Sequence, residues 1–213
     1  MVVPRRGLFL DLDGTLADSL PALRRAYDDF LGHYGRQSGE AEFQSLNGPP
    51  LTEIVARLGK SHGLPGRPEE WLALYRGLMD RAHEEAAPAQ GARETLEQAR
   101  ARGWTIAVVT STANAAARAW LARVQLDGFI ATVVGGDDVK RGKPDPEPYR
   151  LALERTGCVA GASFAVEDGV QGARAALAAG LPTWILGKDI PELRAMPLHR
   201  GRLANLPALI ALL

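Results

Sequence analysis

The sequence predicts an α/β protein with a doubly wound, Rossmann-like parallel sheet and a helical module inserted after the first strand. From about residue 86 onward, short apolar runs alternate with segments of helical periodicity. Runs such as Thr105–Val109 are β-branched and apolar, as in strands that are covered on both faces. Strands and helices that take turns along a chain are typical of a parallel sheet.

The first expected strand is the apolar run Leu8–Leu10, which leads directly into Asp11-Leu12-Asp13-Gly14-Thr15. Between about residues 19 and 85, apolar residues recur at three- and four-residue spacing and no segment alternates like a strand. We therefore expect a Rossmann-like core formed by residues 1–18 and 86–213, with a helical domain at residues 19–85. The helices expected there have their apolar stripes at Leu20–Tyr34, Leu51–Leu58 and Trp71–Leu78.

The second half of the chain continues the alternation to about residue 186. A helix through Ala92–Ala99 precedes the strand Thr105–Val109, and Gly103 separates the two. The remaining expected elements are helices at Asn114–Val124, after Pro146 and at Val170–Ala179, and strands at Phe129–Val134, Ser163–Val166 and Thr183–Leu186.

Composition and charge exclude several classes of protein. The 213 residues carry 25 Lys and Arg against 25 Asp and Glu, so no basic excess indicates nucleic acid binding. No apolar run approaches the roughly 18 residues of a membrane span, and the N-terminus lacks the apolar stretch of a signal peptide. One cysteine cannot form an intrachain disulfide. A cytoplasmic protein with no membrane partner is expected; the oligomeric state does not follow from the sequence.

Asp11 and Asp13 are the first candidate site residues. They occupy alternate positions after a strand, so their side chains could project together from its carboxyl end, where ligands bind in parallel α/β sheets. Two adjacent carboxylates repel unless a cation or a proton intervenes, and Mg²⁺ is commonly held by carboxylates together with substrate phosphate oxygens. The alternative is an ordinary Asp-Gly turn.

Polar residues also follow three later strands. The run Thr110-Ser111-Thr112 could seat an anion, with Thr110 and Ser111 as the candidate residues, or simply cap the next helix. Lys143, in a loop with two prolines, could hold a phosphate, or lie in solvent as most lysines do. Glu167 and Asp168 supply a second acidic pair for a shared metal site, with Asp168 as a ligand and Glu167 in support; the alternative for Asp168 is a helix N-cap.

Together these segments resemble the haloacid dehalogenase-like hydrolase superfamily over essentially the whole chain. DLDGTLADS, VVTST, RGKPDPEPY and FAVEDGVQGARAALAAG are similar to its four motifs, in the same order. The helical insertion is similar to the small α-helical cap of the family. The DSLP after the first motif and the stretch Gly48–Leu51 look most like phosphoglycolate phosphatase-like members.

The resemblance implies a Mg²⁺-dependent phosphatase that acts on a small phosphorylated metabolite. It implies that Asp11 is the nucleophile that becomes an aspartyl-phosphate, and that Asp13 is the general acid and then the base. Thr110, Ser111 and Lys143 would bind the phosphoryl group. The metal would be held by Asp11, by the backbone carbonyl of Asp13 and by Asp168.

Three alternatives remain beside this interpretation. A β-phosphoglucomutase-like enzyme would use the same residues, but Leu23 stands where those relatives carry a cap histidine. A response-regulator receiver also phosphorylates an aspartate at a strand end, but it is shorter and places its acidic pair ahead of that aspartate. A non-catalytic protein that binds a phosphorylated ligand is the third. Substrate choice is expected to depend on the helical domain, where the candidate residues are Asn47, Gly48, Pro49 and Arg57.

Overall fold

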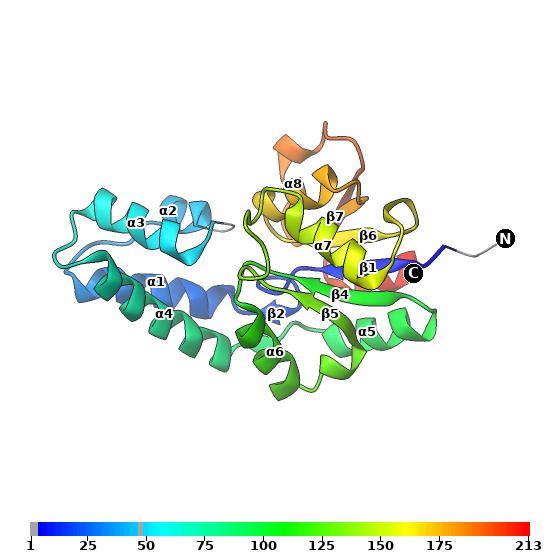
Figure 1. The fold of residues 1–213 in the computed structure, drawn as a ribbon, viewed down its shortest axis with the longest axis horizontal. Helices are drawn as coiled ribbons and strands as arrows, with labels where there is room; N and C mark the ends of the chain where they lie inside the picture. The colour runs from blue at the N-terminus through cyan, green and yellow to red at the C-terminus, as the bar shows by residue number, and fades with distance from the viewer. Residues whose placement is uncertain (1–3, 47–48) are drawn as a thin grey trace. The chain divides into compact units, whose positions relative to one another are not determined.

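The computed structural model describes residues 4–46 and 49–213, and the chain divides into two compact units. The first unit combines residues Met1–Asp18 with Ala87–Leu213 and contains a parallel sheet (Figure 1). The second unit, Ser19–Ala86, is helical. Among the described residues, no helix has both the length and the apolar character needed to cross a bilayer.

The sheet of the first unit has the strand order β5-β4-β1-β6-β7-β8, and every neighbouring pair is parallel. The first strand in the sequence, β1, lies at the centre of the sheet, and β4 and β6 flank it on either side. The predicted doubly wound α/β class is therefore confirmed. The strands are β1 (Gly7–Leu10), β4 (Thr105–Val109), β5 (Ile130–Val134), β6 (Phe164–Glu167), β7 (Thr183–Leu186) and β8 (His199–Leu203).

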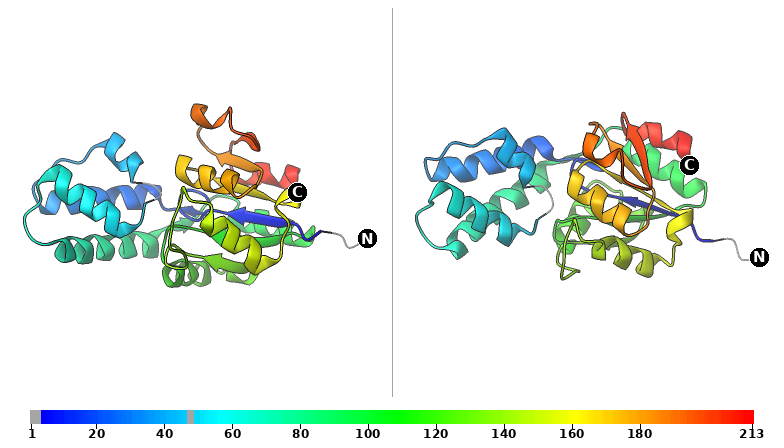
Figure 2. Two further views of the ribbon diagram at one scale, coloured as in Figure 1. Left: turned by 45° about the horizontal axis from the view of Figure 1, so that its top comes forward. Right: turned by 90° about the horizontal axis from the view of Figure 1, so that it is seen from above.

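Helices lie on both sides of this sheet (Figure 2). They are α5 (Ala92–Ala101), α6 (Asn114–Arg123), α7 (Glu147–Thr156) and α8 (Val170–Ala178). Helices α7 and α8 pack on one face, where Tyr149 and Ala176 share a buried cluster with Phe9 of β1. Because strand side chains alternate, the fully buried Leu8 and Leu10 face the opposite side. Every strand side chain at the centre of the sheet is thus covered, which explains the apolar runs in the sequence.

Three features of this unit were not predicted. Strand β8 extends the sheet beyond β7, although its sequence HRGRL shows no apolar run. A short antiparallel pair joins β2 (Ala17–Asp18) to β3 (Ala87–Pro88) at the points where the chain leaves and re-enters the unit. The 3-10 segment Leu206–Leu212 packs on α5, and Arg102 donates a hydrogen bond of 2.7 Å to the carbonyl of Ile210.

The helical unit has its own apolar core. It contains α1 (Leu20–His33), α2 (Glu40–Ser45), α3 (Leu51–His62) and α4 (Pro68–Glu85), and α4 packs against both α1 and α3. Phe30, Leu58 and Tyr75 belong to the buried cluster between them. Helix α2 was not predicted because its sequence EAEFQS has no apolar stripe and none of its residues is buried.

Candidate active site

The candidate site lies at the carboxyl ends of β1, β4 and β6, which are neighbours in the sheet. Asp11 directly follows β1, and its backbone N–H still pairs with Val166 of β6 at 3.1 Å. The chain then turns at Gly14, whose φ of 81° lies in the left-handed region that glycine adopts without strain. This turn is closed by a hydrogen bond of 2.9 Å from the Gly14 N–H to the Ala17 carbonyl.

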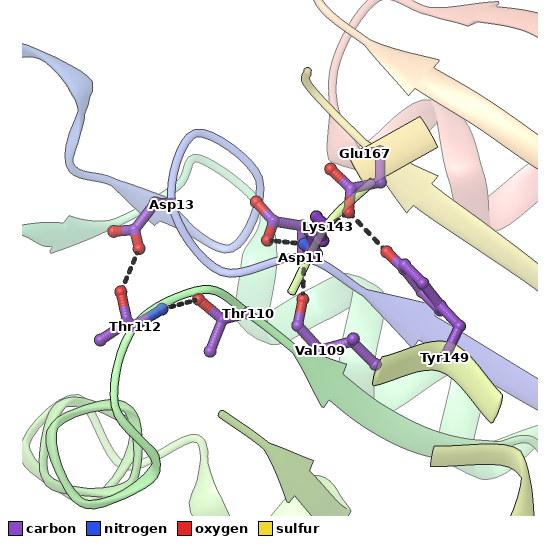
Figure 3. Close-up of polar contacts among 8 residues, drawn as sticks. All are labelled: Asp11, Asp13, Val109, Thr110, Thr112, Lys143, Tyr149 and Glu167. Atoms are coloured by element: carbon purple, nitrogen blue, oxygen red, sulfur yellow. Dashed lines mark hydrogen bonds and ion pairs between the residues drawn. The ribbon is translucent and has the colours of Figure 1, made fainter. Parts of the chain in front are cut away.

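Lys143 is buried at this edge, with 6% of its surface exposed, so the alternative of a solvated lysine is wrong. Within the described residues its ammonium donates to Asp11 Oδ1 at 2.7 Å, Glu167 Oε1 at 2.6 Å and the carbonyl of Val109 at 2.9 Å (Figure 3). Burial opposes the charge of the ammonium, but Asp11 and Glu167 outweigh that effect and raise the pKa of Lys143. These contacts match the three donors of an ammonium group, so the lysine stays charged and fixed.

Glu167 is held at the end of β6 by a second donor. The hydroxyl of Tyr149 on α7 donates to Glu167 Oε1 at 2.5 Å, beside the bond from Lys143 (Figure 3). A Cβ atom added to Gly172 of α8 would stand 2.1 Å from the Glu167 carboxylate oxygens, so glycine is required there. The carboxylate is therefore enclosed by the side chain of Lys143 and by helices α7 and α8.

Three buried carboxylates, those of Asp11, Glu167 and Asp168, have ligand oxygens within 4.8 Å of one another. Burial raises the pKa of all three; it takes Glu167 to about 8 and Asp168 to about 7, and the charge on Asp11 adds to both shifts. Lys143 offsets part of this in each case. When all are ionised, these three carboxylates and the Lys143 ammonium carry a net charge of minus two; nearby, Lys188 lowers the pKa of Asp168 and Asp13 raises it.

This set of residues fits a hard divalent cation. Asp168 Oδ2 is buried and, among the described residues, has no hydrogen-bond partner. An unpaired buried carboxylate oxygen is costly, and oxygen ligands with an excess of two negative charges suit such an ion. The alternative role of Asp168 as a helix cap is wrong, because the N-cap of α8 is Gly169. Asp13 is not part of this carboxylate cluster; the proposed contact from its backbone carbonyl stays a prediction.

The loop after β4 brings Thr110 and Thr112 to the same edge. The alternative that Thr110 or Ser111 caps the next helix is wrong, since the N-cap of α6 is Ala113. Thr110 Oγ1 instead accepts a hydrogen bond of 3.1 Å from the Thr112 N–H, and the Thr112 hydroxyl donates to Asp13 Oδ2 at 2.7 Å. Asp13 is half-buried, whereas Asp11 is buried, so the two aspartates lie in different surroundings.

The structure thus brings Asp11, Lys143, Glu167 and Asp168 together, and Thr110 directly follows the neighbouring strand β4. Sequence reasoning missed Tyr149, which occupies an apolar position of the α7 pattern and so carries no polar signal. It placed Thr112 in the possible anion seat Thr110–Thr112 but did not foresee the contact of Thr112 with Asp13.

The residues proposed for substrate choice belong to the helical unit. Arg57, on α3, is exposed and donates to Ser45 Oγ at 3.2 Å. Pro49 is half-buried and lies shortly before α3. Asn47 and Gly48 lie outside the described residues, so their role stays a prediction.

Comparison with known proteins agrees with this geometry. Residues 8–186 match the haloacid dehalogenase-like hydrolase family. The pyrophosphatase PpaX of Bacillus velezensis is 32% identical over 178 residues, which span 83% of this chain and 80% of that protein. The phosphoglycolate phosphatase of Yersinia pestis is 32% identical over 188 residues, 83% of this chain and 78% of that protein.

A solved structure shows the same fold. CbbY from Rhodobacter sphaeroides, crystallised with phosphate, superposes with a TM-score of 0.80 at 22% identity, over 96% of each chain. The chain belongs to the haloacid dehalogenase-like hydrolase family. Within that family it is a phosphatase.

Proposed function

We propose that the protein is a Mg²⁺-dependent phosphatase that hydrolyses a small phosphorylated metabolite through an aspartyl-phosphate on Asp11. The observation that carries this proposal is the buried group at the end of β1. It joins Asp11 to Lys143 at 2.7 Å and leaves an oxygen of Asp168 without a partner among the described residues. A phosphate monoester and a divalent cation would each complete one part of this arrangement.

Asp11 suits the role of nucleophile because Lys143 holds it in place and favours its ionised form against the effect of burial. In the first step an oxygen of Asp11 bonds to phosphorus, the bond from phosphorus to the leaving oxygen breaks, and Asp13 gives that oxygen a proton. In the second step Asp13 takes a proton from water, which attacks phosphorus and releases inorganic phosphate and the free Asp11 carboxylate. Covalent catalysis divides one difficult displacement into two easier ones.

The residues that would hold Mg²⁺ are Asp11, Asp168 and the backbone carbonyl of Asp13. When bound, the ion neutralises negative charge that develops on the transferred phosphoryl oxygens. Glu167 supports the site instead, because Lys143 and Tyr149 already occupy Oε1. This division agrees with the hydrogen bonds: Glu167, the last residue of β6, is paired at Oε1, whereas Asp168 Oδ2 has no partner among the described residues.

Lys143 and the Thr110–Ser111 loop are proposed to bind the phosphoryl group. The contacts of Lys143 with Asp11, Glu167 and Val109 match its donor capacity, so a direct contact with phosphate requires it to give up one of them. Exchange of the Asp11 contact would free the nucleophile at the same time. Thr110 lies at the end of the neighbouring strand, and Ser111 is exposed in the loop that follows.

The proposed substrate class is a small monoester or anhydride of phosphate, with phosphoglycolate and pyrophosphate as the first candidates because relatives of this chain are named for them. The helical unit is proposed to act as a cap that selects among such substrates and excludes water during turnover. Substitution of Asn47, Gly48, Pro49 or Arg57 is then expected to change the ranking of substrates more than the rate with the best one.

Phosphate release from a panel of compounds tests the proposal. The panel contains phosphoglycolate, pyrophosphate, sugar phosphates, nucleotides and an aryl phosphate, each with Mg²⁺ and with a chelator. Release is expected to require both Mg²⁺ and Asp11, so Asp11→Asn is the control variant. A folded protein that releases phosphate from none of these compounds would count against the phosphatase, and glucose phosphates tested for isomerisation would then identify a mutase.

A further inference from the structure

We propose that Thr112 is a positioning residue that orients the carboxyl group of Asp13 toward the oxygen of the leaving group. This inference rests on the proposed function, since it concerns the acid–base role of Asp13. It adds a residue that lies outside the group formed by Asp11, Lys143, Glu167 and Asp168.

The contact itself joins two different loops at the active edge of the sheet. The Thr112 hydroxyl, from the loop after β4, donates to Asp13 Oδ2, from the turn after β1, at 2.7 Å (Figure 3). The two residues are 99 positions apart in the sequence, so only the adjacency of β1 and β4 brings them together. In Figure 3, this pair lies apart from the group in which Lys143 joins Asp11 to Glu167.

Thr112 is held in place by the protein and does not depend on a ligand for its position. Its N–H donates to Thr110 Oγ1 at 3.1 Å, and its carbonyl accepts from the Gly136 N–H at 3.0 Å. A Cβ atom on Gly136 would stand only 2.3 Å from the carbonyl oxygen of Ser111, so the loops after β4 and β5 are in tight contact. The hydroxyl that meets Asp13 is therefore presented from a backbone fixed on both sides.

This hydrogen bond fixes the orientation of the Asp13 carboxyl group by holding one of its two oxygens. A hydroxyl both donates and accepts, so Thr112 can stay hydrogen-bonded to Oδ2 at 2.7 Å while Oδ1 of the same carboxyl group faces away from it. The hydroxyl donates when Asp13 is ionised and can donate or accept when Asp13 is protonated, so the contact does not depend on the charge of Asp13. Thr112 can thus hold the side chain in one orientation through both steps, and proton transfer depends steeply on such orientation.

Substrates with different leaving groups separate this role from a general structural one. Phenyl phosphate releases a basic oxygen that needs a proton, whereas dinitrophenyl phosphate releases a stable anion that does not. We measure kcat/KM, which reports the first phosphoryl transfer, for both compounds with Thr112→Val, Thr112→Ala and Thr112→Ser. Thr183→Val is the matched control, because it removes a buried hydroxyl whose bond to the Leu181 carbonyl lies at the amino end of β7.

General acid catalysis contributes about 10²- to 10⁴-fold, so loss of its orientation is expected to cost about 10- to 100-fold with phenyl phosphate. With dinitrophenyl phosphate, Thr112→Val and Thr112→Ala are expected to keep kcat/KM within a few-fold of the wild type. Thr112→Ser, which retains the hydroxyl, and Thr183→Val are expected to match the wild type with both compounds.

Two results would overturn the inference: an equal loss with both compounds, or no loss with phenyl phosphate. If the equal loss came from KM alone, Thr112 would be assigned to substrate binding instead of positioning. Failure of the proposed function would look different. Either the Asp11→Asn variant would still release phosphate, or the wild type would release none.

Discussion

Replacement of Lys143 by methionine tests whether this residue balances the buried carboxylates. The variant keeps a side chain of similar length but leaves Asp11 and Glu167 without the ammonium that contacts them at 2.7 and 2.6 Å. Both carboxyl groups are almost fully buried. Removal of one partner of a buried ion pair costs about 3–5 kcal/mol, because the remaining charge is uncompensated. We expect a loss of this size in the free energy of unfolding at pH 8.

The cost should depend on pH in a predictable direction. With Lys143 absent, Asp11 and Glu167 can avoid an uncompensated charge only by binding protons, and proton binding is easier at low pH. The loss at pH 5.5 should therefore be clearly smaller than the loss at pH 8. Lys143→Met combined with Glu167→Gln should recover part of the stability at pH 8, since one of the two charges is gone.

Urea unfolding in the presence of EDTA, followed by circular dichroism, measures these differences. Lys140→Met is the matched control, because it removes a charge from an exposed lysine three residues away. A Lys143→Met protein within 1 kcal/mol of the wild type at pH 8 would refute the reasoning. So would a loss that is the same at both pH values.

Two further predictions concern the same cluster. Gly172→Ala places a Cβ 2.1 Å from a carboxylate that Lys143 and Tyr149 hold in place, so we expect a loss of about 1–3 kcal/mol in urea unfolding and a large loss of activity. Gly77→Ala is its control, since a Cβ there meets nothing within 4 Å. A Gly172→Ala enzyme as stable and active as the wild type would contradict this prediction. The folded state keeps the protons of Glu167 and Asp168, with pKa values of about 8 and about 7, at pH values where the unfolded chain has lost them. In EDTA the free energy of unfolding should therefore fall as pH rises from the ordinary carboxyl range to about 8. Asp168→Asn should flatten this dependence. A free energy of unfolding that rises with pH, or a profile that Asp168→Asn leaves unchanged, would show that these groups are ionised in the folded state.

The fold was largely predictable because buried strands have a distinctive sequence. β1, β4 and β7 are continuous apolar or β-branched runs, and the sheet needs that composition because helices cover both of its faces. Strand β8 and helix α2 escaped prediction for the opposite reason. Both are largely exposed, so neither requires an apolar pattern, and their place is set by hydrogen bonds and packing on elements formed elsewhere.

The candidate site was predictable only in part. Asp11 and Asp168 could be identified because each is a charged residue close after an apolar strand, and Lys143 because it lies in a loop with two prolines. Parallel strands end at one edge of the sheet, so the two aspartates were expected to lie near each other. Tyr149 could not be identified, because its ring belongs to the core and only its hydroxyl reaches Glu167. The contact of Thr112 with Asp13 could not be predicted, because it joins two loops and depends on the register between β1 and β4.

Capture of the phosphorylated enzyme tests the central claim most directly. The protein is mixed with Mg²⁺ and an aryl phosphate, stopped with acid during turnover, digested and examined by mass spectrometry. One added phosphoryl group is expected on the peptide that contains Asp11. It should be absent from Asp11→Asn, which should also lose turnover. A phosphoryl group on another residue, or an Asp11→Asn enzyme that turns over near the wild-type rate, would contradict it.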